Sequence, residues 1–153
     1  MQARRICKAE HLAEALSGVG AEKFGGRWNL KGDRMVYMSS NLSLACLEIF
    51  VHLGPNPMPD GYYSIEATIP DALSFEELTE SSLPRNWREF PSPSALENLG
   101  STWLREQRSV ALIVPSAVNP EETNILLNPN HPEFADIKIA DSKPFRFNPR
   151  MWK

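Results

Sequence analysis

An apolar segment with a single acid in its middle constrains the fold of this chain more than any other feature. The pattern from Leu42 to Leu53 predicts a helix, with Asn41 or Ser40 as its N-cap and Gly54 just past its C-terminal end. Nearly all of the remaining residues in this segment are apolar, and a helix that is apolar all round is expected to be buried. Glu48, at its centre, would then be a carboxylate inside the protein.

A buried carboxylate needs an explanation, because removing its charge from water costs several kcal/mol unless a partner compensates. One explanation is a structural pair with an arginine or with His52, which lies one helical turn further on. The other is that Glu48 opens into a ligand-binding cleft. The residues alone leave these two explanations open.

A glycine-rich turn precedes this helix and suggests what such a cleft would bind. Gly25 and Gly26 allow close backbone approach, and Arg27 follows with a planar group suited to phosphate or carboxylate. Trp28 can stack on a flat ligand. The alternative is an ordinary loop with a surface arginine. The helix that follows favours a different interpretation, in which residues 24–52 form one wall of an anion-binding pocket.

A serine after a very apolar strand is the third polar candidate. Residues 109–114 form a continuous apolar run that predicts a central strand, and Ser116 lies just past its end. Judged by its neighbours alone, a turn serine that caps a backbone group is the favoured interpretation. No G-x-S-x-G pattern surrounds it, so a hydrolase nucleophile is unsupported.

Composition bounds the classes of protein to consider. The chain has 153 residues, of which 42% are hydrophobic and 23% charged, which predicts one globular domain over residues 1–153. A net charge of −3 gives no support to direct nucleic-acid binding. No apolar run is long enough for a membrane span or a signal segment, so we expect a cytoplasmic protein. Cys7 and Cys46 are expected to be free thiols, and the three scattered histidines predict no metal site.

The remaining pattern predicts an α+β fold with a small mixed sheet rather than a doubly wound one, because short strands outnumber helices. Helices are predicted over 9–16 and 94–107, a helical turn over 75–78, and loops over 54–61 and 83–91, the latter anchored by Trp87. Strands are predicted around Arg5–Cys7 and over 35–38, 62–69, 109–114, 124–127, 137–139 and 145–147.

Arg27, Tyr37 and Glu48 together suggest a specific chemistry. Arginine can hold a pyrophosphate, an aromatic ring can pack on a flat leaving group, and a carboxylate can stabilise an oxocarbenium-like sugar. Neither a P-loop nor a G-x-G-x-x-G turn is present in the sequence. A nucleotide would therefore be a substrate of this site rather than a tightly held cofactor.

These segments together resemble a known family. The GGRWN turn, VYMSSNLSLACLEIFVHL, VALIVPSAV and NILLNPNHPEF are similar to the corresponding parts of RES-domain toxins of bacterial toxin–antitoxin systems, which are named for an arginine, a glutamate and a serine. The resemblance covers nearly the whole chain. It implies an ADP-ribosyltransferase-like fold, a type II system with an Xre-like antitoxin as protein partner, and growth arrest of the host.

The resemblance also implies an activity and roles for single residues. NAD⁺ would be a substrate whose nicotinamide–ribose bond is cleaved by hydrolysis or phosphorolysis, with ADP-ribosylation of a protein target as the alternative. The signature residues fall on Arg27, Glu48 and Ser116, with Tyr37 at the family's tyrosine position. Arg27, Tyr37 and Glu48 would be catalytic. NAD⁺ would be contacted by Arg27, Tyr37, Ser116, Trp28 and Ser39. Ser116 would either hydrogen-bond the nucleotide or position Glu48, and the role of Arg5 stays open.

Two other classes of protein compete with an enzyme. A non-catalytic nucleotide-binding module would retain its ligand without releasing nicotinamide. A purely structural partner of a DNA-binding protein would show no ligand-dependent stabilisation.

Overall fold

One mixed β-sheet organises the computed structural model, which describes residues 1–55 and 59–152. Its strands follow the order β4-β5-β6-β2-β1-β3-β7, and β8 pairs with β3 beside β7. Only the β4–β5 pair is parallel among the pairs described. The strands are β1 (Gln2–Lys8), β2 (Val36–Ser39), β3 (Tyr62–Thr68), β4 (Phe75–Glu77), β5 (Ala111–Pro115), β6 (Thr123–Leu127), β7 (Lys138–Ile139) and β8 (Lys143–Phe145).

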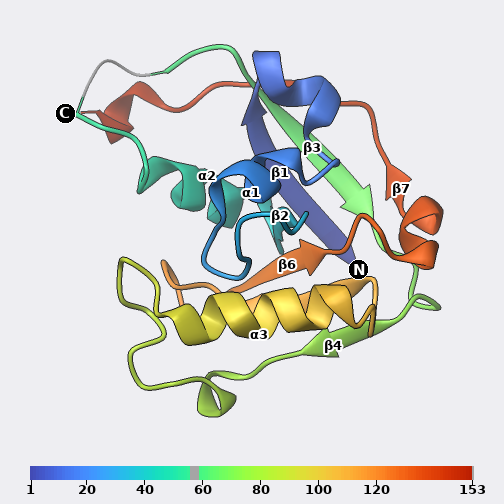
Figure 1. The fold of residues 1–153 in the computed structure, drawn as a ribbon. Helices are drawn as coiled ribbons and strands as arrows, with labels where there is room; N and C mark the ends of the chain where they lie inside the picture. Colours follow the sequence, from blue (N-terminus) through green and yellow to red (C-terminus); the bar gives the residue numbers. More distant parts are fainter. Residues whose placement is uncertain (56–58, 153) are drawn as a thin grey trace.

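In the described part of the chain, three α-helices pack around this sheet. In Figure 1, α1 (Val19–Phe24) and α2 (Leu42–Phe50) lie in front of β1 and β2, whereas α3 (Ser94–Arg105) runs across the lower part of the molecule near β4 and β6. Short 3₁₀ helices cover Ala9–Glu14, Glu80–Ser82, Pro132–Asp136 and Pro149–Met151. The predicted α+β fold with a mixed sheet is confirmed, although the sheet has more strands than expected.

The two faces of the central strands belong to different clusters. Ile125 and Leu127 of β6 belong to a core cluster on one face of the sheet. Leu126, between them, belongs to a second cluster with Leu96 and Trp103 of α3 on the other face. This alternation follows from the two-residue period of a strand. It places Ser39 and Asn124 on the same face as Leu126, because they lie two residues from Tyr37 and Leu126 on paired strands.

Helix α2 begins where predicted but ends earlier than predicted. The Asn41 side chain accepts a hydrogen bond from the backbone N–H of Leu44, which confirms it as the N-cap. The helix ends at Phe50 rather than at Leu53, so Gly54 does not terminate it. The prediction of a helix buried all round is also wrong, because Leu47 is 38% and Val51 53% exposed, and only Leu44 and Ala45 of the helix are buried.

Other elements differ from prediction for local reasons. Residues 75–77 form strand β4 rather than a helical turn, because they complete the edge of buried β5 through parallel pairing. The expected helix over 9–16 is a 3₁₀ helix ending at Glu14. A new helix, α1, then begins at Val19, because Gly18 adopts φ 74° and lets the chain turn back. The final strand covers 143–145 rather than 145–147.

Other predictions concern two loops, the two cysteines and membrane-spanning segments. Trp87 is buried and anchors its loop, and Cys7 and Cys46 are both free thiols. The predicted loop over 54–61 includes residues 56–58, which lie outside the described residues. No helix in the described part of the chain is long and apolar enough to cross a bilayer.

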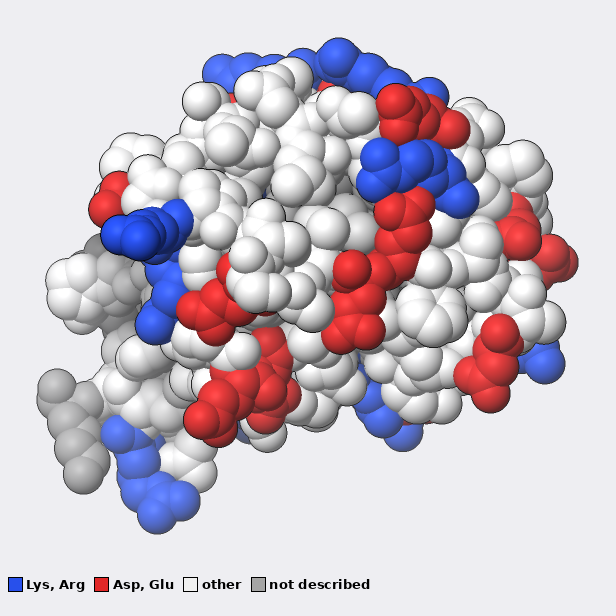
Figure 2. Space-filling model, turned by 90° about the horizontal axis from the view of Figure 1, so that it is seen from below, with Lys and Arg blue, Asp and Glu red and all other residues white. Residues whose placement is uncertain are grey.

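The face on the side of α3 and β4 carries charges of both signs. Figure 2 shows acidic side chains in its centre and basic side chains mainly towards its rim. Some of these charges are paired, since Arg105 bonds Asp33 and Arg108 bonds Glu76 and Glu106. This face therefore offers no continuous basic surface to a polyanion.

Candidate functional site

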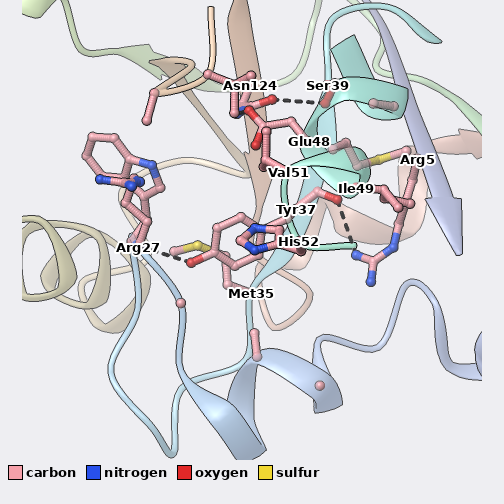
Figure 3. Close-up of a pocket in the computed structure, with 18 of the residues that line it drawn as sticks. Arg5, Arg27, Met35, Tyr37, Ser39, Glu48, Ile49, Val51, His52 and Asn124 are labelled. Carbon is pink, nitrogen blue, oxygen red and sulfur yellow. Dashed lines mark hydrogen bonds between the residues drawn. The ribbon is translucent and has the colours of Figure 1, made fainter. Parts of the chain in front are cut away.

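A large open cavity lies where α1, α2 and the glycine-rich turn meet the sheet. Its volume is about 1170 Å³, which is enough for a dinucleotide-sized ligand. Figure 3 shows Glu48 at the top of this cavity beside Asn124 and Ser39, with Arg27 and Arg5 on opposite sides. The wall predicted from residues 24–52 therefore lines a real cavity, with Arg27, Tyr37 and Glu48 among its residues.

Glu48 is held by two short hydrogen bonds to one of its oxygens. Its Oε1 accepts from the Ser116 hydroxyl at 2.7 Å and from Nδ2 of Asn124 at 2.6 Å. Among the described residues no hydrogen bond occupies Oε2, and no ion pair joins Glu48 to His52 or to an arginine. The cleft explanation for this acid therefore prevails over the structural pair.

Arg27 has a double attachment to a loop on the far side of the cavity. Its Nη1 donates to the backbone carbonyls of Trp87 at 2.7 Å and Glu89 at 3.0 Å. Burial lowers the pKa of this guanidinium, while the nearby Glu48 charge opposes that shift. Among the described residues its Nε and Nη2 donors have no protein partner, so they are free for an anion.

The Tyr37 hydroxyl faces the turn rather than the solvent. It donates to Oδ1 of Asn29 at 2.7 Å and accepts from the backbone N–H of Trp28 at 3.0 Å. Burial is the main cause that raises the pKa of this phenol, so the hydroxyl stays protonated and able to donate. A Cβ added at Gly26 would lie 2.6 Å from this hydroxyl, which explains a glycine there. Tyr37 thus shapes the turn and leaves its ring beside the cavity.

Arg5 is a second cation in the wall of the cavity. Its Nη1 donates to the backbone carbonyl of Tyr37 at 3.2 Å, and no carboxylate pairs with it among the described residues. Burial lowers the pKa of this guanidinium. A half-buried cation with free donors is partly desolvated, and a ligand anion would compensate that cost. Arg5 therefore belongs to the candidate site, where sequence reasoning had left its role open.

The other three predicted contact residues are buried. Trp28 borders the cavity but is only 2% exposed and packs with Trp87 and Trp103, so stacking of its ring on a ligand is not supported. Ser116 is fully buried and its hydroxyl contacts Glu48, in agreement with the second of the two roles that the resemblance implied. Ser39 borders the cavity but is also buried, and its hydroxyl donates to Oδ1 of Asn124 at 2.9 Å.

The mouth of the cavity is apolar and exposed. Phe24 is 78%, Phe90 82% and Val51 53% exposed, and all three border the cavity. His52 lies near Phe90, with the two ring centroids 6.5 Å apart. Exposed apolar groups of this size commonly mark contact surfaces.

Sequence reasoning missed Asn124 as a member of the site. A weak signal exists, because asparagine is a poor strand former and stands here within an otherwise apolar strand. Its partner could not be inferred, since that requires the register that pairs Asn124 with Ser39. Arg5 had a weaker signal, because it is a charged residue in the middle of a strand, but Arg4 beside it is charged as well.

Comparison with known protein families agrees with this geometry. The model of the RES domain matches residues 2–148, nearly the whole chain. The chain belongs to the RES domain family. The resemblance to this family is therefore confirmed.

Two relatives have similar sequences over most of this chain. The chain is 42% identical over 141 residues to the Prs ADP-ribosylating toxin of a Sphingobium species, covering 91% of this chain and 88% of that one. It is 36% identical over 152 residues to the Toxin Res of Yersinia enterocolitica, covering 99% of both.

A solved structure shows the same fold. A chain of the crystal structure of the M. tuberculosis MbcT–MbcA toxin–antitoxin complex superposes with a TM-score of 0.77. The two sequences are 16% identical, and the match covers 99% of this chain and 86% of that one. This likeness supports a single compact domain with a mixed sheet and few helices.

Proposed function

We propose that this chain is the toxin of a bacterial type II toxin–antitoxin system and consumes NAD⁺ by cleaving its nicotinamide–ribose bond. The observation that carries the proposal is the geometry of Glu48, which lines a large cavity and whose Oε1 is fixed by two donors, while no other described residue bonds Oε2. A fixed carboxylate beside the anomeric carbon stabilises positive charge that develops as nicotinamide leaves.

The remaining walls suit the other parts of NAD⁺. Two phosphates need cations, and the free donors of Arg27 and the weakly satisfied guanidinium of Arg5 can provide them. The Tyr37 ring is available to pack on nicotinamide or ribose. Neither a metal nor a redox step is required for this bond cleavage, because the positive charge on the pyridinium already makes nicotinamide a good leaving group.

A specific similarity favours ADP-ribosylation of a protein as the second candidate. The Sphingobium relative, at 42% identity, carries the name of an ADP-ribosylating toxin. The bond that breaks in NAD⁺ is the same, and only the acceptor differs. An apolar mouth formed by Phe24, Val51 and Phe90 could hold a protein acceptor near the anomeric carbon.

Purified protein incubated with NAD⁺ tests the reaction and identifies the acceptor. Three conditions are compared: buffer without phosphate, phosphate buffer, and buffer with lysate protein. We expect free nicotinamide wherever the acceptor that the protein uses is present. ADP-ribose as co-product indicates water, ADP-ribose 1″-phosphate in phosphate buffer indicates phosphorolysis, and label transferred from NAD⁺ to lysate protein indicates protein modification. Retention of intact NAD⁺ in all three conditions would favour a nucleotide-binding module instead.

Arg27→Lys is expected to weaken NAD⁺ binding by roughly 10- to 100-fold. A lysine cannot reproduce a planar contact to phosphate while it also donates to two carbonyls. Loss of a charged hydrogen bond costs about 1.5–3 kcal/mol. Isothermal calorimetry with a non-cleaved NAD⁺ analogue measures the effect. Arg85→Lys, on the exposed part of the same loop, serves as control. Equal affinities for the two variants would exclude Arg27 from the phosphate site.

The chain should arrest bacterial growth when it is expressed alone, with cellular NAD⁺ falling before growth stops. We propose that an Xre-like antitoxin is the partner that prevents this arrest in the cytoplasm. The partner's terminal segment would cover the cavity and could place a carboxylate on Arg27. Coexpression should restore both growth and NAD⁺. Normal growth and normal NAD⁺ with abundant folded protein would contradict the toxin assignment.

A further inference from the structure

We propose that Asn124 is the positioning residue for the Glu48 carboxylate, and that Ser39 supports the Asn124 amide through a hydrogen bond to its oxygen. This inference rests on the proposed function of Glu48. It assigns a role to a side chain that is outside the arginine, glutamate and serine of the family name. It also changes the role of Ser39 from a ligand contact to a support for Asn124.

Two hydrogen bonds connect side chains from three neighbouring elements. The Ser39 hydroxyl at the end of β2 donates to Oδ1 of Asn124 on β6 at 2.9 Å. Nδ2 of Asn124 then donates to Oε1 of Glu48 on α2 at 2.6 Å. Ser39 and Asn124 are direct partners in the antiparallel β2–β6 pair, so the backbone fixes their separation. Figure 3 shows these three side chains grouped on one side of the cavity.

The charge of Glu48 fixes which end of the Asn124 amide faces the carboxylate. An ionised carboxylate only accepts hydrogen bonds, so the amide must present its nitrogen to Glu48. Its oxygen then faces Ser39, whose hydroxyl is able to donate. Rotation of the amide by half a turn would put Oδ1 against the carboxylate and lose the bond to Glu48, whereas the Ser39 hydroxyl could accept from Nδ2 instead. The Glu48 carboxylate therefore selects the orientation of the amide, and Ser39 supports that orientation by donating to Oδ1.

Two donors on one oxygen also determine where the other oxygen lies. Ser116 and Asn124 approach Oε1 from two different strand ends and together fix the rotation of the carboxylate. Ser116 is already satisfied by the backbone N–H groups of Val118 and Asn119, so its position is set by its own loop. Asn124 supplies the second point that keeps Oε2 available to substrate. Without it, one donor leaves the carboxylate free to rotate.

Two substitutions at Asn124 separate positioning from a merely structural role. Asn124→Ala removes the donor, and we expect kcat to fall by about 10- to 100-fold with KM changed less than threefold. Asn124→Asp preserves shape and still accepts from Ser39, but it replaces the donor to Glu48 by a second carboxylate. A role limited to the β2–β6 contact predicts near-normal kcat for the aspartate variant. Positioning of Glu48 predicts a loss at least as large as that of the alanine variant.

Asn128→Ala is the matched control. Asn128 directly follows β6 and is buried, whereas Asn124 is half-buried, and the Nδ2 of Asn128 donates to the backbone carbonyl of Leu104 at 3.1 Å, away from the cavity. We expect this variant to lose thermal stability while it retains the wild-type kcat. A comparable fall of kcat in both asparagine variants would show that loss of a buried amide, rather than loss of the Glu48 contact, causes the effect.

A double-mutant cycle tests the contact without relying on activity. If Asn124 bonds Glu48, the Tm shift of Asn124→Ala should be clearly smaller in a Glu48→Ala background than in the wild type. Additive Tm shifts, or a folded Asn124→Ala variant with wild-type kcat, would overturn the positioning role. If the wild type releases no nicotinamide, the proposed function fails, whereas the cycle still decides whether Asn124 holds Glu48.

Discussion

Replacing Glu48 by glutamine is expected to reduce NAD⁺ cleavage by at least 10²- to 10³-fold while the fold is retained. Glutamine has almost the same volume, and its carbonyl oxygen can still accept from Ser116 and Asn124. The charge that would stabilise an oxocarbenium-like state is lost, and removal of such preorganised stabilisation commonly costs this much. Nicotinamide release by the purified variant measures the effect, with an unchanged circular dichroism spectrum as evidence of folding.

A matched control distinguishes this role from a general effect of charge in the cavity. Glu97 of α3 also borders the cavity, but it accepts no hydrogen bond from another side chain among the described residues. Glu97→Gln removes the same charge and should reduce cleavage less than about threefold. Wild-type turnover by Glu48→Gln, or equal losses in both variants, would show that Glu48 is not the catalytic carboxylate.

The local part of this site could be predicted because it is nearly continuous in sequence. Arg27, Tyr37 and Glu48 lie within one turn–strand–helix segment, and each is marked by residue type and spacing. The unusual cost of an acid in an apolar helix singled out Glu48. Family resemblance then supplied Ser116, which no local pattern favoured. Its contact with Glu48 agrees with one of the two roles that the resemblance implied.

Contacts between distant segments could not be predicted in this way. Asn124 reaches Glu48 only because β6 pairs with β2, and Arg27 reaches Trp87 and Glu89 across 60 or more residues of chain. Periodicity reports which face a residue occupies but not which strand lies beside it. The strand at 75–77 shows the same limit, because pairing with β5 decides its conformation.

The exposure of α2 has a functional explanation that hydrophobicity alone could not give. Apolar residues all round a helix predict burial by the protein itself. Leu47 and Val51 are nevertheless exposed, and Val51 borders the mouth of the cavity with Phe24 and Phe90. An apolar surface around a site is consistent with a partner or an acceptor protein that covers it. The apolar pattern therefore correctly indicated an apolar contact surface on α2. Only the structure shows that part of this surface faces outward at the mouth of the cavity.

Gly100→Ala is expected to destabilise the protein strongly and to impair the site, although Gly100 lies outside the cavity lining. A Cβ at this position of α3 would lie 1.8 Å from the backbone carbonyl oxygen of Trp28. No rotamer change can relieve a clash with backbone, so the helix and the GGRWN turn must separate. Overpacking costs about 1–3 kcal/mol or more. We expect a Tm loss of roughly 5–10 °C for a chain of this size.

The same displacement should weaken ligand binding, because Trp28 directly follows Arg27 and donates its N–H to Tyr37. Thermal unfolding and NAD⁺-analogue binding measure the two effects on one sample. Gly20→Ala in α1 is the control, since a Cβ there meets nothing within 4 Å and alanine favours a helix. It should leave Tm unchanged or raise it slightly. If Gly100→Ala has the Tm and affinity of the wild type, then α3 does not hold the turn that carries Arg27.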